Sequence, residues 1–331
     1  MKKKYNVYGI GNALVDLDFT VSEDFLKEHN VQKGLMTLVD EDTQHRLINA
    51  IDHDQVNKKS GGSAANTIIA TSQFGGKAFY SCKVSNDEFG DFYLNDMKEA
   101  GIDTNLDHSE REEGITGKCL VMITDDADRT MNTFLGITVN LSEKEVSEAA
   151  IKDSEYVYLE GYLVASDSGF EAMKLAKKTA ENNNVKTALT LSDPSIVEFF
   201  QPRFEEVIGA SVDLLFCNEE EAMKFTNTND VLSAREELKK AARNFVITQG
   251  SNGAIIYDGD TFIDIEPYPV KAIDTNGAGD MFAGAFLYGL THGKGYAGSG
   301  KLASLASSRI VSQFGPRLKW HEVQEILNQL G

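Results

Sequence analysis

Short apolar runs alternate with amphipathic stretches along most of the chain. From residue 142 onward each apolar run is followed by a stretch whose apolar residues recur at the period of a helix. Strands that alternate with helices in this way predict a mainly parallel sheet with right-handed crossover connections. The expected strands span 5–10, 78–84, 156–161, 187–192, 213–217 and 245–248, and the expected helices span 87–100, 167–182, 203–209, 218–225, 232–243 and 296–314.

Ligands of such a sheet bind at the carboxyl ends of its strands. The polar residues that follow expected strand ends, and should therefore converge, are Asn12, Asn218, Thr248 and Asp280. Residues 15–20 differ from the buried runs because apolar and polar residues alternate there with a period of two, as in a half-buried strand. This strand places Asp16 and Asp18 on one face, and we expect Asp18 to be a solvated acid.

A hairpin with an acidic tip is predicted in the first half of the chain. Residues 117–123 and 130–135 form two alternating strands around the acidic turn. Arg129 follows the tip. Its guanidinium either pairs with Asp126 or Asp128, or reaches over a phosphate from a mobile flap.

Length and composition narrow the class of protein. The 331 residues allow for about two domains. An apolar content of 41% is enough for a sizeable core, and a net charge of −19 disfavours nucleic acid and anionic membranes as partners. The three cysteines are not clustered, which argues against a disulfide framework or a zinc site. Without an apolar leader or a long apolar run, we expect a cytoplasmic protein with small-molecule partners.

The most informative stretch is Asp-Thr-Asn-Gly-Ala-Gly-Asp at 274–280, where an extended segment gives way to an apolar helix. Gly277 and Gly279 lie at the expected helix N-terminus, whose free N–H groups and dipole favour an anion. A carboxylate at Asp280 is repelled by that anion unless it takes a proton from a hydroxyl while the N–H groups hold a transferring phosphoryl group. The alternative is an ordinary acid in the first helical turn.

A second glycine-rich stretch opens the helix that contains Asn66. Gly61 and Gly62 give either a flexible joint or a close backbone approach to a ligand, and Ser63 is a candidate helix cap.

Two other phosphate-binding motifs are absent from the sequence. The dinucleotide fingerprint that begins at Gly9 fails because Leu14 stands where a third small residue is needed, and no P-loop sequence occurs.

The 274–280 stretch resembles the signature of the ribokinase-like (PfkB) family of small-molecule kinases, and within that family the chain is most similar to adenosine kinases. Gly-Asn-Ala-Leu-Val-Asp at 11–16, Gly-Gly-Ser with Asn66, Asp-Arg-Thr at 128–130 and the segment 212–219 also match. The resemblance implies an α/β/α core with a β-rich lid. It assigns residues 1–16, 61–114 and 139–331 to the catalytic domain and 17–60 and 115–138 to the lid.

The resemblance also implies roles for individual residues. Asp280 is the catalytic base, the turn Gly277, Ala278 and Gly279 is the anion hole, and Arg129 covers the phosphates. The implied ribose site consists of Asn12, Asp16, Gly61, Gly62, Ser63 and Asn66, and the implied purine site consists of Met36, Cys119, Met131, Leu135 and Tyr162. The implied ATP site consists of Asn218, Thr248, Gly250, Thr275, Gly277, Gly279, Ser304 and Ser307.

Mg²⁺ is the expected metal, positioned indirectly by Asn218 and Glu221, although the same two residues form a complete helix capping box. A monovalent cation such as K⁺ also belongs to the expected cofactors. The implied reaction is ATP-dependent phosphorylation of the 5′-hydroxyl of adenosine by a monomer or homodimer.

Three departures from the adenosine kinase pattern leave the identity of the phosphoryl acceptor open. Leu35-Met36 stands where animal adenosine kinases have Gln, Thr-Leu-Ser-Asp-Pro at 190–194 replaces Asn-Leu-Ser-Ala-Pro, and the tail helix lacks a His. Inosine, guanosine, or a sugar such as ribose or fructose are the alternative acceptors. A sensor without catalysis is a further alternative, but it would require loss of Asp280 or the glycines, and all of these are present.

Overall fold

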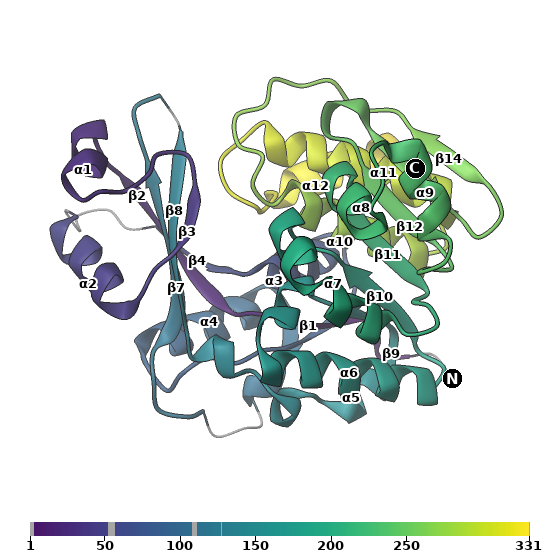
Figure 1. Cartoon of the computed structure of the whole chain (residues 1–331), viewed down its shortest axis with the longest axis horizontal. Helices are drawn as coiled ribbons and strands as arrows, with labels where there is room; N and C mark the ends of the chain where they lie inside the picture. Colours follow the sequence, from purple (N-terminus) through teal and green to yellow (C-terminus); the bar gives the residue numbers. More distant parts are fainter. Residues whose placement is uncertain (1–2, 52–56, 108–110, 127, 331) are drawn as a thin grey trace.

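The computed structural model describes residues 3–51, 57–107, 111–126 and 128–330, which fold around two sheets (Figure 1). In this part of the chain the main sheet has nine strands in the order β14-β13-β12-β11-β10-β9-β1-β5-β6. Its strands are β1 (Tyr5–Ile10), β5 (Ala78–Ser81), β6 (Ile102–Thr104), β9 (Ser154–Leu159), β10 (Lys186–Thr190), β11 (Leu214–Asn218), β12 (Phe245–Thr248), β13 (Ala254–Tyr257) and β14 (Phe262–Ile265). All neighbours are parallel except at the edge formed by β12, β13 and β14, so the predicted mainly parallel sheet is confirmed.

Helices cover both faces of the main sheet and make a three-layer arrangement (Figure 1). One layer consists of α3 (Ser63–Gln73), α4 (Glu88–Glu99), α10 (Ala278–Thr291), α11 (Gly295–Val311) and α12 (Trp320–Leu330). The other consists of α5 (Glu148–Lys152), α6 (Asp167–Asn182), α7 (Pro194–Ile208), α8 (Glu219–Thr226) and α9 (Val231–Leu238). None of the helices in the described ranges is long and apolar enough to cross a membrane.

The second sheet stands beside the main one and has the order β3-β8-β7-β2-β4 (Figure 1). It contains β2 (Leu14–Thr20), β3 (Met36–Leu38), β4 (Asn57–Gly61), β7 (Thr116–Ile123) and β8 (Arg129–Gly136), with α1 (Glu23–Glu28) and α2 (Glu41–Ala50) on its outer side. This sheet starts at Leu14, so Asp16 belongs to it although the expected domain boundary followed residue 16. Residue 127 of the predicted hairpin tip lies outside the described residues.

Helix α7 begins nine residues before the predicted start at Arg203, because Asp193 caps it and Pro194 occupies its first turn, where a proline costs no hydrogen bond. Pro202 does not begin the helix but lies within it, and the backbone departs from helical geometry at Phe200.

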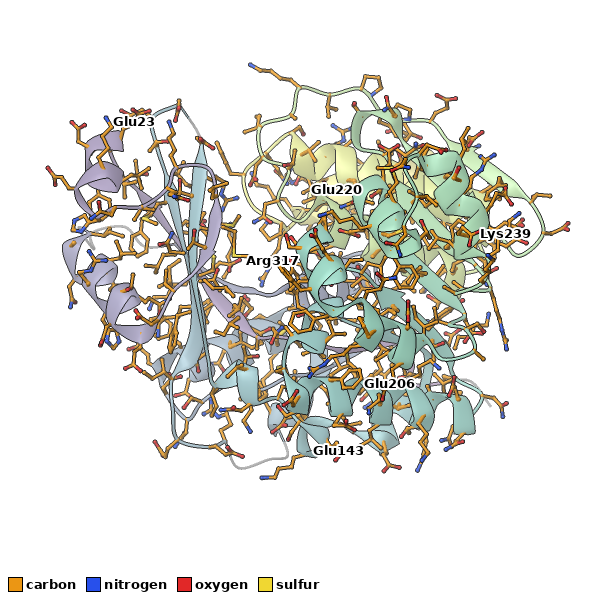
Figure 2. The ribbon with its side chains drawn as sticks, in the orientation of Figure 1. Glu23, Glu143, Glu206, Glu220, Lys239 and Arg317 are labelled. Atoms are coloured by element: carbon orange, nitrogen blue, oxygen red, sulfur yellow. The ribbon has the colours of Figure 1, made fainter. Side chains whose placement is uncertain are left out.

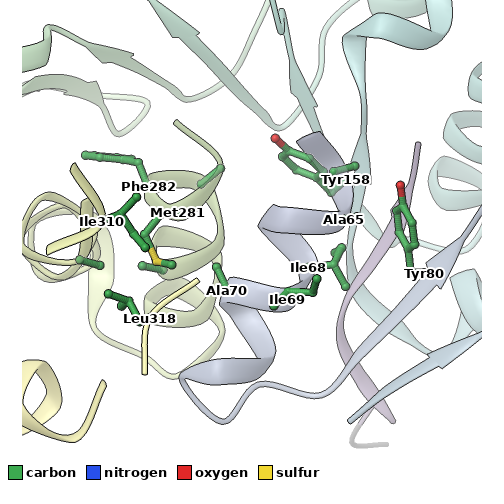
Figure 3. Close-up of a cluster of buried hydrophobic side chains, with 14 of the residues drawn as sticks. Ala65, Ile68, Ile69, Ala70, Tyr80, Tyr158, Met281, Phe282, Ile310 and Leu318 are labelled. Carbon is green, nitrogen blue, oxygen red and sulfur yellow. The ribbon is translucent and has the colours of Figure 1, made fainter. Parts of the chain in front are cut away.

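Helices α3 and α10 pack in close contact, and this contact positions the candidate site. A Cβ on Gly284 would lie 2.6 Å from the Cβ of Ala70 and 2.4 Å from the carbonyl oxygen of Thr67, so only glycine fits there. The Thr71 hydroxyl donates a 3.1 Å hydrogen bond to the Gly284 carbonyl. Figure 3 shows the two helices side by side, with Ile68, Ile69 and Ala70 on one and Met281 and Phe282 on the other. The start of α10 is thereby held against the start of α3.

Arg317 fixes the junction of the two sheets, where Figure 2 places it. Its guanidinium donates to both carboxylate oxygens of Asp96, at 3.0 and 2.6 Å, and to the Ser60 carbonyl at 2.7 Å. Asp96 in turn accepts from the Ser60 N–H at 2.9 Å. Strand β4 is therefore anchored to the large domain just before Gly61 and Gly62.

Candidate active site

The predicted anion hole lies at the N-terminus of α10. Gly277 caps the helix with φ 76°, and a Cβ there would lie 2.6 Å from the Pro316 ring, so the turn requires glycine for two reasons. A Cβ on Gly279 would meet no atom within 4 Å, which leaves open space beside the first helical turn. N–H groups of a first turn have no acceptor within the helix, so this turn can receive an anion.

Asp280 is oriented, among the described residues, by two side chains of α3 that the sequence analysis singled out. Its two carboxylate oxygens accept hydrogen bonds from Ser63 Oγ at 2.7 Å and Asn66 Nδ2 at 3.1 Å. The surrounding protein raises the pKa of Asp280 to about 6, and the two hydrogen bonds oppose that rise. Asn66 keeps its buried Oδ1 atom without a partner in the described residues, so that oxygen is available to a ligand. Ser63 thus bonds to Asp280, whereas the predicted cap position of the helix is taken by Gly62.

Glu160 is a site residue that the sequence reasoning missed. It follows strand β9, is only 1% exposed, and accepts hydrogen bonds from the Asn12 N–H, the Asn12 side-chain amide and the Ala64 N–H, at 3.1, 2.8 and 2.8 Å. Burial raises the pKa of Glu160 to about 7, against the effect of these hydrogen bonds. The signal was available, because Glu160 ends an apolar strand at the same sheet edge as Asn12.

Two glycines shape the space next to Asn12. A Cβ on Gly62 would lie 2.2 Å from the Asn12 carbonyl oxygen, and Gly62 has φ 105°. A Cβ on Gly61 would lie 2.5 Å from both carboxylate oxygens of Asp16. Both glycines are therefore needed for close approach, and they bring Asp16 and Asn12 to the start of α3.

Asp16 has a pKa that burial raises to about 7, with a further contribution from Asp18, while Arg129, Arg317 and Lys59 lower it. Within the described residues no group donates a hydrogen bond to its carboxylate, so both oxygens can accept from a bound hydroxyl.

The lid residues expected to contact the purine ring of an acceptor lie on one face of the small sheet. The register pairs Met36 with Met131, Met131 with Val121, and Cys119 with Asp16, so these side chains point to one side. Leu135 follows Met131 by an even number of residues and lies on the same face. Leu38, which the sequence reasoning did not name, adds to this face and is 61% exposed.

Tyr162 lies on the large domain, in the turn Gly161–Ala165. Burial raises the pKa of its hydroxyl above the ordinary value, and the charges of Asp193 and Asp280 add to that rise.

Arg129 crosses from the small sheet to the 274–280 loop. Its guanidinium forms ion pairs with Asp274 and, at 3.3 Å, with Asp18, while Asp274 also accepts from the Gly315 N–H at 3.1 Å. The alternative that the Arg129 guanidinium pairs with Asp126 or Asp128 is wrong, because Lys33 pairs with Asp126 and the carboxylate of Asp128 accepts only from the Arg129 backbone N–H, at 2.9 Å, within the described residues. The expectation of a solvated Asp18 is also wrong, since that acid lies between two cations, with Lys59 at 3.8 Å.

A pocket of about 390 Å³ opens beside the 274–280 stretch, which contributes Thr275, Ala278 and Gly279 to its lining. It contains most residues expected to bind ATP, namely Thr248, Gly250, Thr275, Gly279, Ser304 and Ser307. Tyr268, Val270 and Val311 give the pocket apolar walls, which suit the flat adenine ring of ATP. Ser304 and Ser307 donate to the carbonyls of Glu266 and Ala278, at 3.0 and 2.9 Å, so they shape the pocket through the backbone.

Asn218 and Glu221 form the predicted capping box at the start of α8. The Asn218 amide donates to Glu221 Oε1 at 2.7 Å, the Asn218 N–H donates to Oε2 at 3.0 Å, and the Glu221 N–H returns a bond of 2.8 Å. Burial raises the pKa of Glu221 to about 7. Both carboxylate oxygens are thus occupied, which suits an indirect contact with Mg²⁺ through water better than direct coordination. No cluster of three or more metal-binding side chains occurs in the described ranges.

Comparison with known proteins identifies the family and several relatives of this chain. Residues 32–322 match the model of the pfkB family of carbohydrate kinases. Adenosine kinase 1 of Arabidopsis thaliana is 27% identical over 93% of this chain and 94% of its own length.

Two solved structures are similar over nearly the whole chain. A probable sugar kinase from Rhizobium etli has a TM-score of 0.89 at 29% identity, covering 99% of each chain. An adenosine kinase from Sinorhizobium meliloti has a TM-score of 0.88 at 30% identity, covering 98% of this chain and 99% of its own. The chain has the ribokinase-like fold, is related to adenosine kinases and sugar kinases alike, and belongs to the PfkB family of carbohydrate kinases.

Proposed function

We propose that the protein transfers the γ-phosphoryl group of ATP to the 5′-hydroxyl of a purine nucleoside, with adenosine as the preferred acceptor. One observation carries the catalytic part of this proposal. Asp280 stands between the 390 Å³ pocket and the group formed by Asn12, Asp16 and Asn66, with the anion-binding turn beside it. An acceptor hydroxyl bound by that group lies next to the carboxylate of Asp280. The γ-phosphoryl group of ATP bound in the pocket lies next to the N–H donors of the turn.

Residues of the chain can assist each step of an in-line transfer of the phosphoryl group. Asp280 accepts the hydroxyl proton, and its pKa near 6 leaves it ionised at neutral pH yet basic enough to assist. The α10 N-terminus stabilises charge on the transferring oxygens. Mg²⁺, when bound with ATP, neutralises phosphate charge, and Asn218 and Glu221 are placed to orient its water ligands.

The lid favours a nucleoside over a free sugar. Met36, Leu38, Met131 and Leu135 present an apolar face, which a purine ring can cover and a free sugar cannot. The carboxylate of Asp16 suits the two vicinal hydroxyls of ribose. A sugar kinase is the second candidate, supported by the similarity to the probable sugar kinase from Rhizobium etli.

A panel assay tests the proposal. Purified protein with ATP and Mg²⁺ is offered adenosine, inosine, guanosine, ribose and fructose, and ADP release is followed while the product is identified by ³¹P NMR. We expect adenosine to give the highest kcat/KM and a 5′-monophosphate product. Efficient phosphorylation of ribose with adenosine inert would reject the nucleoside proposal in favour of the sugar kinase.

A further inference from the structure

A second cavity, which we call the side cavity, lies at the carboxyl ends of strand β5 and the edge strand β6 and has a volume of about 360 Å³. It shares no lining residue with the nucleotide pocket and is nearly as large. Small-molecule sites span roughly 300–1,000 Å³. Phe79, Val84, Leu106 and Val146 give the cavity an apolar wall, so it has room and surface for an organic molecule.

Lys83 is the charged centre of the side cavity. Its side chain is only 7% exposed, and its ammonium group lies 2.9 Å from Glu145 and 3.0 Å from Glu112. Burial lowers the pKa of Lys83, but the hydrogen bonds to the two carboxylates outweigh it and leave the pKa raised. Lys83 therefore stays charged and needs carboxylate partners.

The two carboxylates are held very differently. Glu145 is 11% exposed, and its other oxygen accepts from the N–H and hydroxyl of Ser142 at 2.8 and 2.9 Å. Glu112 is 53% exposed, and among the described residues its carboxylate pairs only with Lys83 and, at 3.9 Å, with Lys144. Exposed ion pairs contribute little free energy, so Glu112 is the partner that another carboxylate can replace.

Arg111 adds a second cation to the wall. Its Nη2 pairs with Asp91, but its Nη1 is buried and finds no hydrogen-bond partner among the described residues. A buried donor without an acceptor is costly. We propose that the side cavity binds a small organic carboxylate with an apolar body, which displaces Glu112 from Lys83 and packs against the wall near Phe79.

The location of the side cavity connects this ligand to the lid. Glu112 lies shortly before β7, Glu145 lies after β8, and Lys83 joins the two. Ser85 extends the connection, since its hydroxyl donates to the Glu112 carbonyl at 3.1 Å and its N–H donates to the Thr116 hydroxyl at 3.0 Å. Displacing the Glu112 side chain removes one tie at the base of the lid, so bound carboxylate should speed amide hydrogen exchange in β7.

The test uses benzoate as the probe and benzamide as its neutral control, by isothermal titration of the full chain saturated with ATP. We expect saturable benzoate binding in the range of about 1 mM or tighter, with benzamide at least about tenfold weaker. Lys83→Met should abolish the preference for benzoate, whereas Lys152→Met, which changes an exposed lysine, should not. Glu112→Gln should tighten benzoate binding because it removes the competing carboxylate.

Equal binding of benzoate and benzamide, no saturable binding of benzoate, or unchanged benzoate affinity in Lys83→Met would overturn the proposal. Where Lys83→Met does not fold, Glu112→Gln decides, and an unchanged dissociation constant in that variant overturns it. None of these outcomes depends on the acceptor that the active site phosphorylates.

Discussion

Ser63 donates a 2.7 Å hydrogen bond to Asp280 although 217 positions separate the two residues. The bond joins the first turn of α3 to the first turn of α10, so the glycine-rich stretch at 60–66 and the stretch at 274–280 make one site. A serine hydroxyl on one carboxylate oxygen and the Asn66 amide on the other leave Asp280 little rotational freedom. The candidate base is preorganised before a ligand arrives.

Replacing Asp280 with Asn keeps the size of the side chain and removes the proton acceptor. General-base catalysis contributes roughly 10²–10⁴-fold, so kcat should fall by that factor while the acceptor dissociation constant changes little. Steady-state kinetics and a separate binding titration measure the two effects. A variant that keeps more than about a tenth of wild-type kcat would contradict the assignment of Asp280 as the base.

The pH profile should reveal the same group. Because the pKa of Asp280 is raised to about 6, the carboxylate becomes protonated as pH falls through that value, and kcat/KM should decline there and level off above it. The Ser63 hydrogen bond lowers this pKa, so Ser63→Ala should move the acidic limb to higher pH. A limb at the same pH in both proteins would assign it to another group, such as Asp16, whose pKa is about 7.

Asp16 should distinguish ribonucleosides from deoxyribonucleosides. Its carboxylate has no protein donor in the described residues, and losing a hydrogen bond to a charged acceptor costs roughly 1.5–3 kcal/mol. Adenosine should therefore exceed 2′-deoxyadenosine in kcat/KM by about tenfold or more. Asp16→Ala should lose activity on adenosine and most of this preference. An undiminished preference in the variant would mean that Asp16 does not contact the sugar.

Arg129 should act in catalysis more than in acceptor binding. In the structure it pairs with Asp274 and Asp18, and a bound triphosphate offers a competing partner of higher charge. Arg129→Ala should lower kcat more than it raises the acceptor KM, and Lys33→Ala, which removes the cation paired with Asp126 at the hairpin tip, is the control. A change in KM alone, or no change, would leave Arg129 with only a neutralising role.

Glu160 should stabilise both the fold and the position of Asn12. Three N–H donors converge on its two oxygens, and Glu160→Gln leaves at least one of them without an acceptor, at a cost of about 1–3 kcal/mol in the free energy of unfolding. The acceptor KM should rise as well, because Asn12 loses its restraint. Urea unfolding and kinetics check both, with exposed Glu148→Gln as the control. Unchanged stability and KM would contradict this role.

The Glu160 carboxyl also makes a prediction about pH. Its pKa rises from 4.5 to about 7 on folding, so the folded protein binds the proton more tightly than the unfolded chain. The proton-linked part of the Glu160 contribution to the free energy of unfolding is therefore present below about pH 4.5 and is lost as pH rises through about 7. Urea unfolding at several pH values should show this dependence in the wild type and a weaker one in Glu160→Gln.

Elements with strong apolar periodicity could be predicted from the sequence, and those formed only by pairing could not. The bounds of β1, α6 and β12 agree with the structure residue for residue. Strand β4, Asn-Lys-Lys-Ser-Gly, has no apolar pattern and is a strand only because β2 pairs with it. Helix α2 was missed because it buries only Gln44 and Leu47.

Site residues, like the elements of the fold, could be predicted where local sequence determines them and not where distant contacts do. Sequence motifs identified residues whose type is demanded by local geometry, such as Gly62 with its positive φ and Gly277 at the start of α10. The position of Glu160 at a strand end was visible in the sequence, but its partners and the Arg129–Asp274 pair depend on contacts between residues about a hundred or more positions apart in the chain, which no local pattern encodes.

The orientation of Asp280 by α3 has a consequence for how new acceptors could be obtained. Both side chains that hold the base belong to the large domain, whereas the apolar face of Met36, Leu38 and Met131 belongs to the small sheet. In the proposed function most of the chemistry therefore belongs to the large domain, with Arg129 on β8 as the exception, whereas the apolar face expected to contact the purine belongs to the small sheet. Grafting the small sheet of a sugar kinase onto this large domain, with Arg129 retained, should exchange the acceptor while leaving Asp280, Ser63 and Asn66 in place.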